Sequence, residues 1–185
     1  MTKSLSELDR EWFSAINGLA GQSPFLDEIM FQFSQEGNLL VPGIFLAVYW
    51  SWRNWGEAQI AIPCLLLLLG LSDLLGGQVK NLIGRSRPCQ VLEQINQLVG
   101  CGGSFSMPSN HAFNSSTAVT FMIVLYPSLG WVLVPVLMMV GISRVFLGAH
   151  YLTDVLAGIV MGVVVGGTVA LIVKKKALVW KQASR

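Results

Sequence analysis

Two histidines and one aspartate are the residues of this chain best suited to chemistry. His150 and Asp154 lie four residues apart in "SRVFLGAHYLTD" (143–154), a segment that separates two uncharged apolar runs. On a helix this spacing puts both side chains on one face, where the carboxylate can accept the imidazole N–H and fix its tautomer. The other histidine is His111. Because histidine can attack phosphorus or shuttle a proton near neutral pH, all three residues are candidates for catalysis.

Cations and a helix start accompany these residues. Lys80, Arg87 and Arg144 would repel one another if they met without an anion between them, and arginine matches phosphate oxygens with a two-pronged fork. Ser109 and Asn110 open a predicted helix, whose first N–H groups favour a bound phosphate. Ionisable groups next to apolar spans indicate function. The five residues are therefore the predicted phosphate-binding set.

The composition predicts that membrane-spanning helices carry these residues. Of 185 residues, 53% are hydrophobic and 12% are charged, whereas soluble domains contain about 25% charged residues. A net charge of +2 is too small to suggest nucleic-acid binding. The first twenty residues carry Glu7, Asp9 and Glu11, which argues against a secretory signal. The predicted spans are 37–52, 60–75, two within 112–143 that a turn at 126–130 divides, and 155–173.

The N-terminal segment has a different pattern. Ser4 and Glu7 have the spacing of a helix capping box. The apolar stripe that follows consists of Leu5, Leu8, Trp12, Ile16 and Leu19. This pattern favours an amphipathic helix at the membrane surface, with a sixth span as the alternative. We therefore expect an all-α, polytopic membrane bundle of five to six transmembrane helices. It is one domain, 1–185, with N-terminal helices (1–35), a transmembrane bundle (37–173) and a basic tail (174–185).

The basic tail predicts the orientation. Lys174, Lys175 and Lys176 follow the last span directly, and such residues favour the cytoplasmic side. Counting back through the spans places 76–110 and 144–154 together on the outer face of the cell (inner) membrane. We expect the site to face the periplasm or extracytoplasmic side and the C-terminus to be cytoplasmic.

Three sequence blocks carry a family resemblance: Lys-x6-Arg-Pro (80–88), Pro-Ser-x-His (108–111) and Ser-Arg-x5-His-x3-Asp (143–154). Together they resemble the type 2 phosphatidic acid phosphatase (PAP2) superfamily. The resemblance implies a phosphatase without metal or cofactor, in which His150 is the nucleophile, Asp154 orients it and His111 protonates the leaving group. It also implies that the predicted cations, with Ser109, hold the phosphate. The sequence departs from the family's commonest form at one position, where Asn110 stands in place of glycine.

The predicted function is hydrolysis of a lipid phosphate or diphosphate, such as a polyprenyl (undecaprenyl) diphosphate or lipid A phosphate, through a phosphohistidine. Phosphatidylglycerol phosphate and phosphatidate are alternative substrates. A non-catalytic lipid-phosphate binding or transport protein is the alternative of another class, and an ion or proton carrier is the weakest. The expected partners are the phosphorylated lipid and the bilayer, without nucleic acid.

Four features leave alternatives open. Cys89 and Cys101 either form a disulfide or stay free. Arg85 is either a surface charge or a headgroup contact. Asp73, within a span, either bonds to a neighbouring helix or holds Lys80. Gly158, Gly162 and Gly166 indicate close helix packing, within one chain or across a homodimer.

Overall fold

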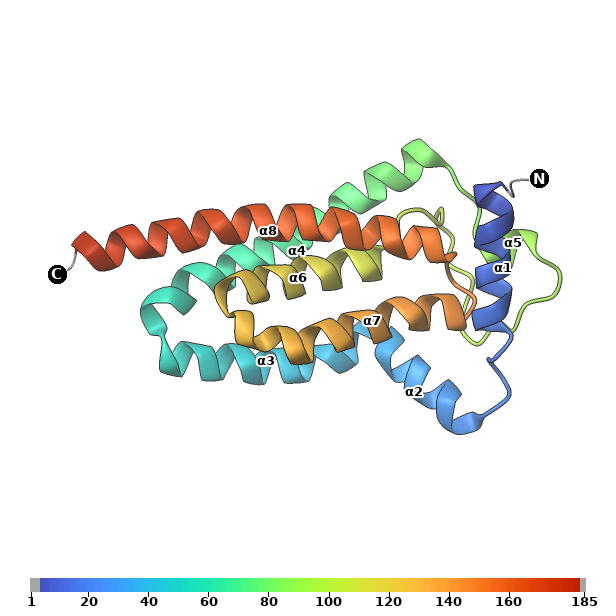
Figure 1. Cartoon of the computed structure of the whole chain (residues 1–185), viewed down its shortest axis with the longest axis horizontal. Helices are drawn as coiled ribbons and strands as arrows, with labels where there is room; N and C mark the ends of the chain where they lie inside the picture. The colour runs from blue at the N-terminus through green and yellow to red at the C-terminus, as the bar shows by residue number, and fades with distance from the viewer. Residues whose placement is uncertain (1–3, 184–185) are drawn as a thin grey trace.

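The structure is a computed structural model that describes residues 4–183, apart from the side chains at 36, 39, 40 and 177–183. Within the described residues the chain consists of helices and loops, without strands (Figure 1). The helices are α1 (Leu5–Asn17), α2 (Pro24–Ser34), α3 (Glu36–Arg53), α4 (Trp55–Ile83), α5 (Pro88–Val91), α6 (Asn110–Leu125), the 3₁₀ turn η1 (Pro127–Leu129), α7 (Gly130–Phe146) and α8 (Leu152–Ala183). The prediction of an all-α fold is confirmed.

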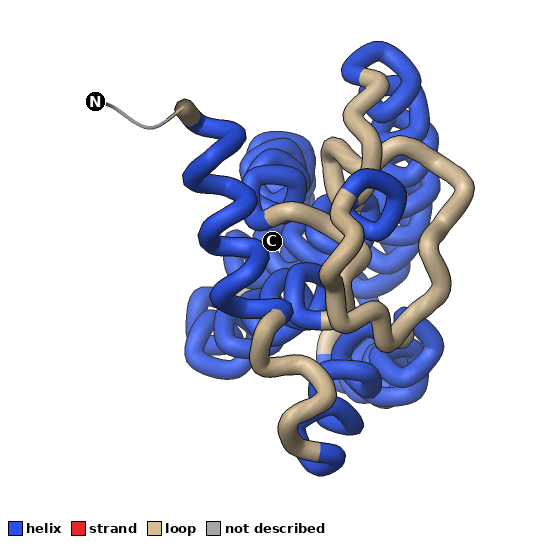
Figure 2. Tube along the Cα trace, turned by 90° about the vertical axis from the view of Figure 1, so that its right-hand side faces the viewer, coloured by secondary structure: helices blue, strands red, loops and turns tan. Residues whose placement is uncertain are grey.

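Five of these helices form a bundle. α3, α4, α6, α7 and α8 lie alongside one another, and α1 lies across one end of them (Figure 1). The long loop between α5 and α6 covers the same end, as Figure 2 shows in the view down the bundle. The C-terminus of α8 lies at the opposite end. Each predicted span falls within one of the five bundle helices.

Three segments are long and apolar enough to cross a bilayer: Trp55–Val91, Pro127–Phe146 and Leu152–Lys176. They support a membrane bundle, and α3 and α6 do not meet the same criterion. α1 and α2 contain 13 and 11 residues, and a span of about 30 Å needs ~20. The structure therefore favours the N-terminal helices as surface elements over a sixth span.

The surface of the bundle is apolar where a soluble protein would be polar. Leu67 and Leu74 of α4, Trp131 of α7 and Leu171 of α8 are all exposed, as are many neighbours. The interior contains small residues such as Ala58 together with large ones such as Phe121. Apolar surface of this extent marks contact with a partner or with lipid, so the bundle has the surface of an integral membrane protein.

α6 and α8 make the most extensive helix pair of the bundle. Gly158 of α8 lies so close to α6 that an added Cβ would be 2.5 Å from the carbonyl oxygen of Ser109. Gly162 and Gly166 meet the backbone of α6 in the same way. The glycine spacing thus serves packing within one chain, as the first alternative predicted, and it locks the start of α6 to the start of α8.

α1 begins as the sequence predicts, with Ser4 as its N-cap and a capping box with Glu7. Leu5, Trp12 and Leu19 of the predicted stripe are exposed. The buried face is a different one. It consists of Asp9, Phe13 and Asn17, spaced by four residues. Phe13 packs against residues of α6, α7 and α8, so α1 docks on the end of the bundle that holds the predicted site.

Candidate active site

Three separate segments meet at the covered end of the bundle. They are the end of α4 with the loop to α5, the loop before α6 with its first turn, and the connection from α7 to α8. The Ser109 N–H donates to the carbonyl oxygen of Asp154 (2.9 Å), which ties the start of α6 to that of α8. The α7–α8 connection turns sharply at Gly148, whose φ of +82° favours glycine. This turn presents His150 to the other two segments.

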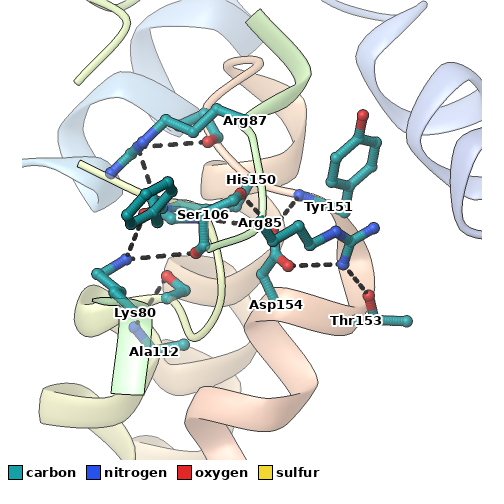
Figure 3. A network of polar contacts seen from close by, with 12 residues as sticks. Lys80, Arg85, Arg87, Ser106, Ala112, His150, Tyr151, Thr153 and Asp154 are labelled. Atoms are coloured by element: carbon teal, nitrogen blue, oxygen red, sulfur yellow. Dashed lines mark hydrogen bonds and ion pairs between the residues drawn. The ribbon is translucent and has the colours of Figure 1, made fainter. Parts of the chain in front are cut away.

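His150 is only 2% exposed, and its two ring nitrogens have different neighbours (Figure 3). Nδ1 lies 3.3 Å from the Ser106 hydroxyl and 3.7 Å from Oδ2 of Asp154. Nε2 lies 3.5 Å from Nη1 of Arg87. Burial lowers the pKa of His150 to about 4, although Asp154 opposes the shift. The ring is therefore neutral at physiological pH, and Nε2 is the nitrogen that faces a cation.

Asp154 is completely buried, and three groups hold its carboxylate. Oδ2 accepts hydrogen bonds from the Ser106 hydroxyl (2.5 Å) and the Tyr151 N–H (2.9 Å). Oδ1 accepts from Nη1 of Arg85 (2.7 Å). A buried carboxylate needs such donors. They fix the carboxylate beside the ring of His150.

The loop at 104–106 holds two buried cations. Arg87 donates from Nε to the Ser104 carbonyl (2.8 Å) and from Nη2 to the Ser104 hydroxyl (3.0 Å). Lys80 donates to the carbonyls of Phe105 (3.0 Å) and Ser106 (3.3 Å). Lys80 and Arg87 interact electrostatically. The structure thus brings together two of the three predicted phosphate-binding cations.

His111 and Arg144 complete the cluster. His111 is half-buried in the first turn of α6, within electrostatic range of Arg144, His150, Arg87 and Lys80. Arg144 is buried and donates to the hydroxyl and carbonyl oxygens of Ser34 at the end of α2. Both predicted residues therefore lie near His150, and α2 as well as α1 contacts the site.

The two residues that open α6 differ in where they point. Ser109 is fully buried and caps the helix, accepting from the Ala112 N–H (3.5 Å). The Asn110 side chain points to α4 instead, where it donates to Asp73 (2.8 Å). The structure therefore does not bring the Asn110 side chain into the phosphate cluster. It also identifies the partner of Asp73 as a neighbouring helix.

Sequence reasoning missed three residues here. Arg85 is more than a plain surface charge, because it forms ion pairs with Asp154 and Asp9. Ser106 lies between His150 and Asp154. None of the specified positions of the three motif blocks is Arg85, Ser106 or Asp9. The one signal available was on α1, where Asp9 shares a face with Phe13 and Asn17.

A disulfide joins Cys89 and Cys101. It closes the segment 89–101, and Ser104, which holds Arg87, follows three residues after Cys101. Of the two alternatives from the sequence, the structure therefore shows the bonded one.

Among the described residues, no three His, Cys, Asp or Glu side chains gather in a way that could hold a metal ion. The absence of a metal or cofactor from the reaction stays a prediction. The arrangement offers a buried, neutral imidazole whose Nε2 faces the Arg87 guanidinium.

Comparison with known proteins agrees with this arrangement. The sequence profile of the PAP2 superfamily matches residues 61–178, more than half of the chain, and this range contains all three motif blocks. The chain belongs to the PAP2 superfamily. The predicted resemblance is confirmed.

Two of three similar relatives have names that describe lipid chemistry, and the third is named as a transport protein. "Undecaprenyl-diphosphatase BcrC" of Bacillus subtilis is 27% identical over 163 residues, which cover 86% of this chain and 81% of that protein. "Lipid A 4'-phosphatase" of Bacteroides thetaiotaomicron is 29% identical over 173 residues, covering 88% and 75%. "Bacitracin transport permease protein BcrC" of Bacillus licheniformis is 28% identical over 160 residues, covering 86% and 78%.

A solved structure supports the PAP2 fold. The transmembrane PAP2-type phosphatidylglycerolphosphate phosphatase of Bacillus subtilis aligns with a TM-score of 0.70 and 25% identity, over 94% of this chain and 86% of that one. The prediction of a membrane lipid phosphatase is confirmed at the level of the family.

Proposed function

We propose that this PAP2 protein removes phosphate from a polyprenyl diphosphate or from lipid A, through a covalent intermediate on His150. The observation that carries the proposal is the environment of His150, with a carboxylate and a hydroxyl at Nδ1 and a cation at Nε2. A phosphate between Nε2 and the cations would present phosphorus to an unprotonated nitrogen. The names of the relatives support these two substrate classes.

In the first proposed step, Nε2 of His150 attacks phosphorus and the bond from phosphorus to the leaving oxygen breaks. Asp154 stabilises the cationic ring through Nδ1–H, and His111 gives its proton to the leaving oxygen. Lys80, Arg87 and Arg144 hold the phosphate oxygens, and Ser109 with the first N–H groups of α6, including that of Asn110, assists them. In the second step His111 takes a proton from water, the water oxygen attacks phosphorus, and the P–N bond breaks.

We also propose that α3, α4, α6, α7 and α8 all cross the membrane, with the site on the extracytoplasmic side. Lys174 follows Asp154 by 20 residues of one helix, which is a rise of ~30 Å and matches the hydrocarbon thickness of a bilayer. The lysines and the site would therefore lie at opposite surfaces, and lysines favour the cytoplasm. The site then meets lipid phosphates of the outer leaflet.

A panel of substrates tests the activity. Purified protein in detergent should release phosphate from undecaprenyl diphosphate or lipid A faster than from phosphatidylglycerol phosphate or phosphatidate. The rate should be unchanged by a chelator. His150→Ala should abolish release, whereas Gln97→Ala, an exposed change in the loop over the site, should retain it. Full turnover by His150→Ala would refute the nucleophile, and loss of activity on chelation would refute the metal-free reaction.

The same panel separates the transport alternative, which the name of one relative raises. A binding or transport protein would bind these lipids without releasing phosphate from any of them. Because binding requires only the cations, His150→Ala would then leave the lipid affinity unchanged.

A further inference from the structure

Asp9 of α1 is a buried charged residue that lies far from the three motif blocks in the sequence. Its carboxylate is only 1% exposed, yet α1 lies on the outside of the bundle end (Figure 1). Oδ2 forms an ion pair with Nη2 of Arg85 (2.5 Å) and accepts from the Thr153 hydroxyl (2.5 Å). Oδ1 accepts from the Thr153 N–H (3.1 Å). All three contacts bind α1 to the loop after α4 and to the first turn of α8.

Arg85 joins this carboxylate to the one beside His150. Its Nη1 donates to Asp154 (2.7 Å) and to the Thr153 hydroxyl (2.7 Å), as Figure 3 shows. Its guanidinium carbon lies 4.2 Å from the centre of the Tyr151 ring. The guanidinium is thus held on two edges and one face, and it bridges Asp9 and Asp154.

The charges of this bridge explain why a second carboxylate is present. Arg85 and Asp154 alone would form a neutral pair, which would oppose a positive charge on His150 only weakly. With Asp9 added, the three side chains carry a net charge of −1. Asp9 also gives the guanidinium a second anchor, so that Asp154 is not drawn toward Arg85 and away from Nδ1, which lies 3.7 Å from Oδ2.

We propose that Asp9 is a positioning residue for Asp154 that acts through Arg85, so that α1 is part of the catalytic apparatus. The inference rests on the proposed roles of His150 and Asp154. When the bond between Nε2 and phosphorus forms, the ring becomes cationic and its Nδ1–H needs a carboxylate that is both charged and in place. Asp9 supplies the charge balance and the rigidity, and it does not touch the substrate.

Asp9→Asn tests this role, because the variant keeps the shape of the side chain, removes its charge and turns one of its two acceptor oxygens into an N–H donor. We expect kcat for phosphate release to fall about tenfold, the scale of outer-shell effects at active sites, with KM within twofold of wild type. The matched control is Glu11→Gln, which removes an exposed carboxylate from the same helix and should retain wild-type kcat. Thermal unfolding of each variant reports whether it is folded. Wild-type kcat in a folded Asp9→Asn variant, or an equal loss in Glu11→Gln, would overturn the inference.

A double-mutant cycle with Arg85→Gln tests the route. If Asp9 acts through Arg85, Asp9→Asn should lower kcat by less than twofold in the Arg85→Gln background. Fully multiplicative losses would overturn the route. Should Asp9→Asn not fold, Thr153→Val removes the hydroxyl between Asp9 and Arg85 and leaves both charges. It should lower kcat about threefold, and wild-type kcat there would count against the proposal.

His150→Ala, measured beside these variants, separates the two levels of the argument. An active His150→Ala variant would refute the proposed function itself. An inactive one together with an unaffected Asp9→Asn would refute only the role of Asp9.

Discussion

The two nitrogens of His150 have different neighbours, and this difference sets which of them reacts. Nδ1 faces Ser106 and Asp154, which favours a proton on that nitrogen, whereas Nε2 faces Arg87. A cation beside Nε2 disfavours a proton there, so the lone pair of Nε2 stays available. The pairing of a carboxylate with the remote nitrogen is the arrangement that a nucleophilic histidine requires.

The first prediction is that His150 stays neutral down to about pH 4. Burial lowers its pKa to that value, helped by Arg87, Lys80 and Arg144 and opposed by Asp154. A lowered pKa means that the neutral, nucleophilic form dominates at every pH above about 4. The chain contains two histidines, so His111→Gln leaves one imidazole ring for a ¹⁵N-histidine NMR titration. Its two nitrogen signals should show a proton on Nδ1 and none on Nε2 at pH 7, and a midpoint near 6.5 would contradict the burial.

The second prediction concerns Ser106, whose hydroxyl lies between His150 and Asp154. Ser106→Ala removes one of the donors to a buried, charged carboxylate, and a hydrogen bond to a charged group contributes about 1.5–3 kcal/mol. We expect kcat to fall about tenfold with little change in KM. Ser51→Ala is the matched control, because that hydroxyl donates to the carbonyl of Ala47 within its own helix α3. An unaffected kcat in Ser106→Ala would show that the hydroxyl does not orient the pair.

The residues of the motif blocks could be predicted, and their supports could not. Lys80, Arg87, His111 and His150 form a pattern that the sequence shows directly, and the structure brings them together. Ser106 and Asp9 belong to no pattern, because their partners are fixed only when separate segments pack. Asn110 is the converse case, because its place in a motif predicts a phosphate contact that the structure does not show. Its side chain lies against Gly76 of α4 instead and donates a hydrogen bond to the Asp73 carboxylate.

At the scale of elements, the active site depends on how closely α8 approaches α6. Gly162 faces the carbonyl of Phe113 and the hydroxyl of Ser116 on α6, and an added Cβ would lie 2.6 Å from that carbonyl oxygen. The residues of this contact are on the same two helices that carry His111 and Asp154. His150, the proposed nucleophile, lies two residues before the start of α8. Any separation of α6 and α8 would therefore move His111, the proposed acid, away from it.

The third prediction follows from this contact. Gly→Ala in a helix normally stabilises by about 1 kcal/mol, but at Gly162 the overpacking should cost roughly 1–3 kcal/mol. Gly162→Ala should lower the Tm in detergent by several degrees and reduce kcat. Gly70→Ala on α4 is the matched control, since nothing lies within 4 Å of its added Cβ. Equal or raised Tm values for both variants would contradict the role of the α6–α8 contact.

The positions of the bundle helices could be predicted from the uncharged runs of the sequence, but the residues at which the helices end could not. α4 continues to Ile83 although its predicted span ends at residue 75. Polarity marks where a helix leaves the hydrocarbon, whereas the helix ends only at Gly84, which has a φ of +65°. The last turns of α4 therefore carry Lys80 out of the apolar region while they keep it at a fixed position.

At the scale of the whole molecule, polarity divides the chain between two ends. One end of the bundle holds the buried cations, the histidines and the disulfide. The opposite end carries the lysines that follow residue 173. The apolar surface lies between them. This division is the physical basis for the proposed orientation, because a bilayer accepts the middle and leaves the two ends in different compartments.

The fourth prediction is that the two ends react from opposite sides of the membrane. In a Cys64→Ala background the remaining cysteines are joined in a disulfide, so a single added cysteine can be labelled. Gln97→Cys, in the loop over the site, should react with a membrane-impermeant maleimide in intact spheroplasts. Asn54→Cys, in the turn between α3 and α4, should react only after permeabilisation, since that turn lies at the far end (Figure 1). Retained phosphatase activity is the control for folding.

Labelling of both positions from one side would show that the bundle does not span the membrane. The reverse pattern would place the site in the cytoplasm, where it could not act on lipids of the outer leaflet.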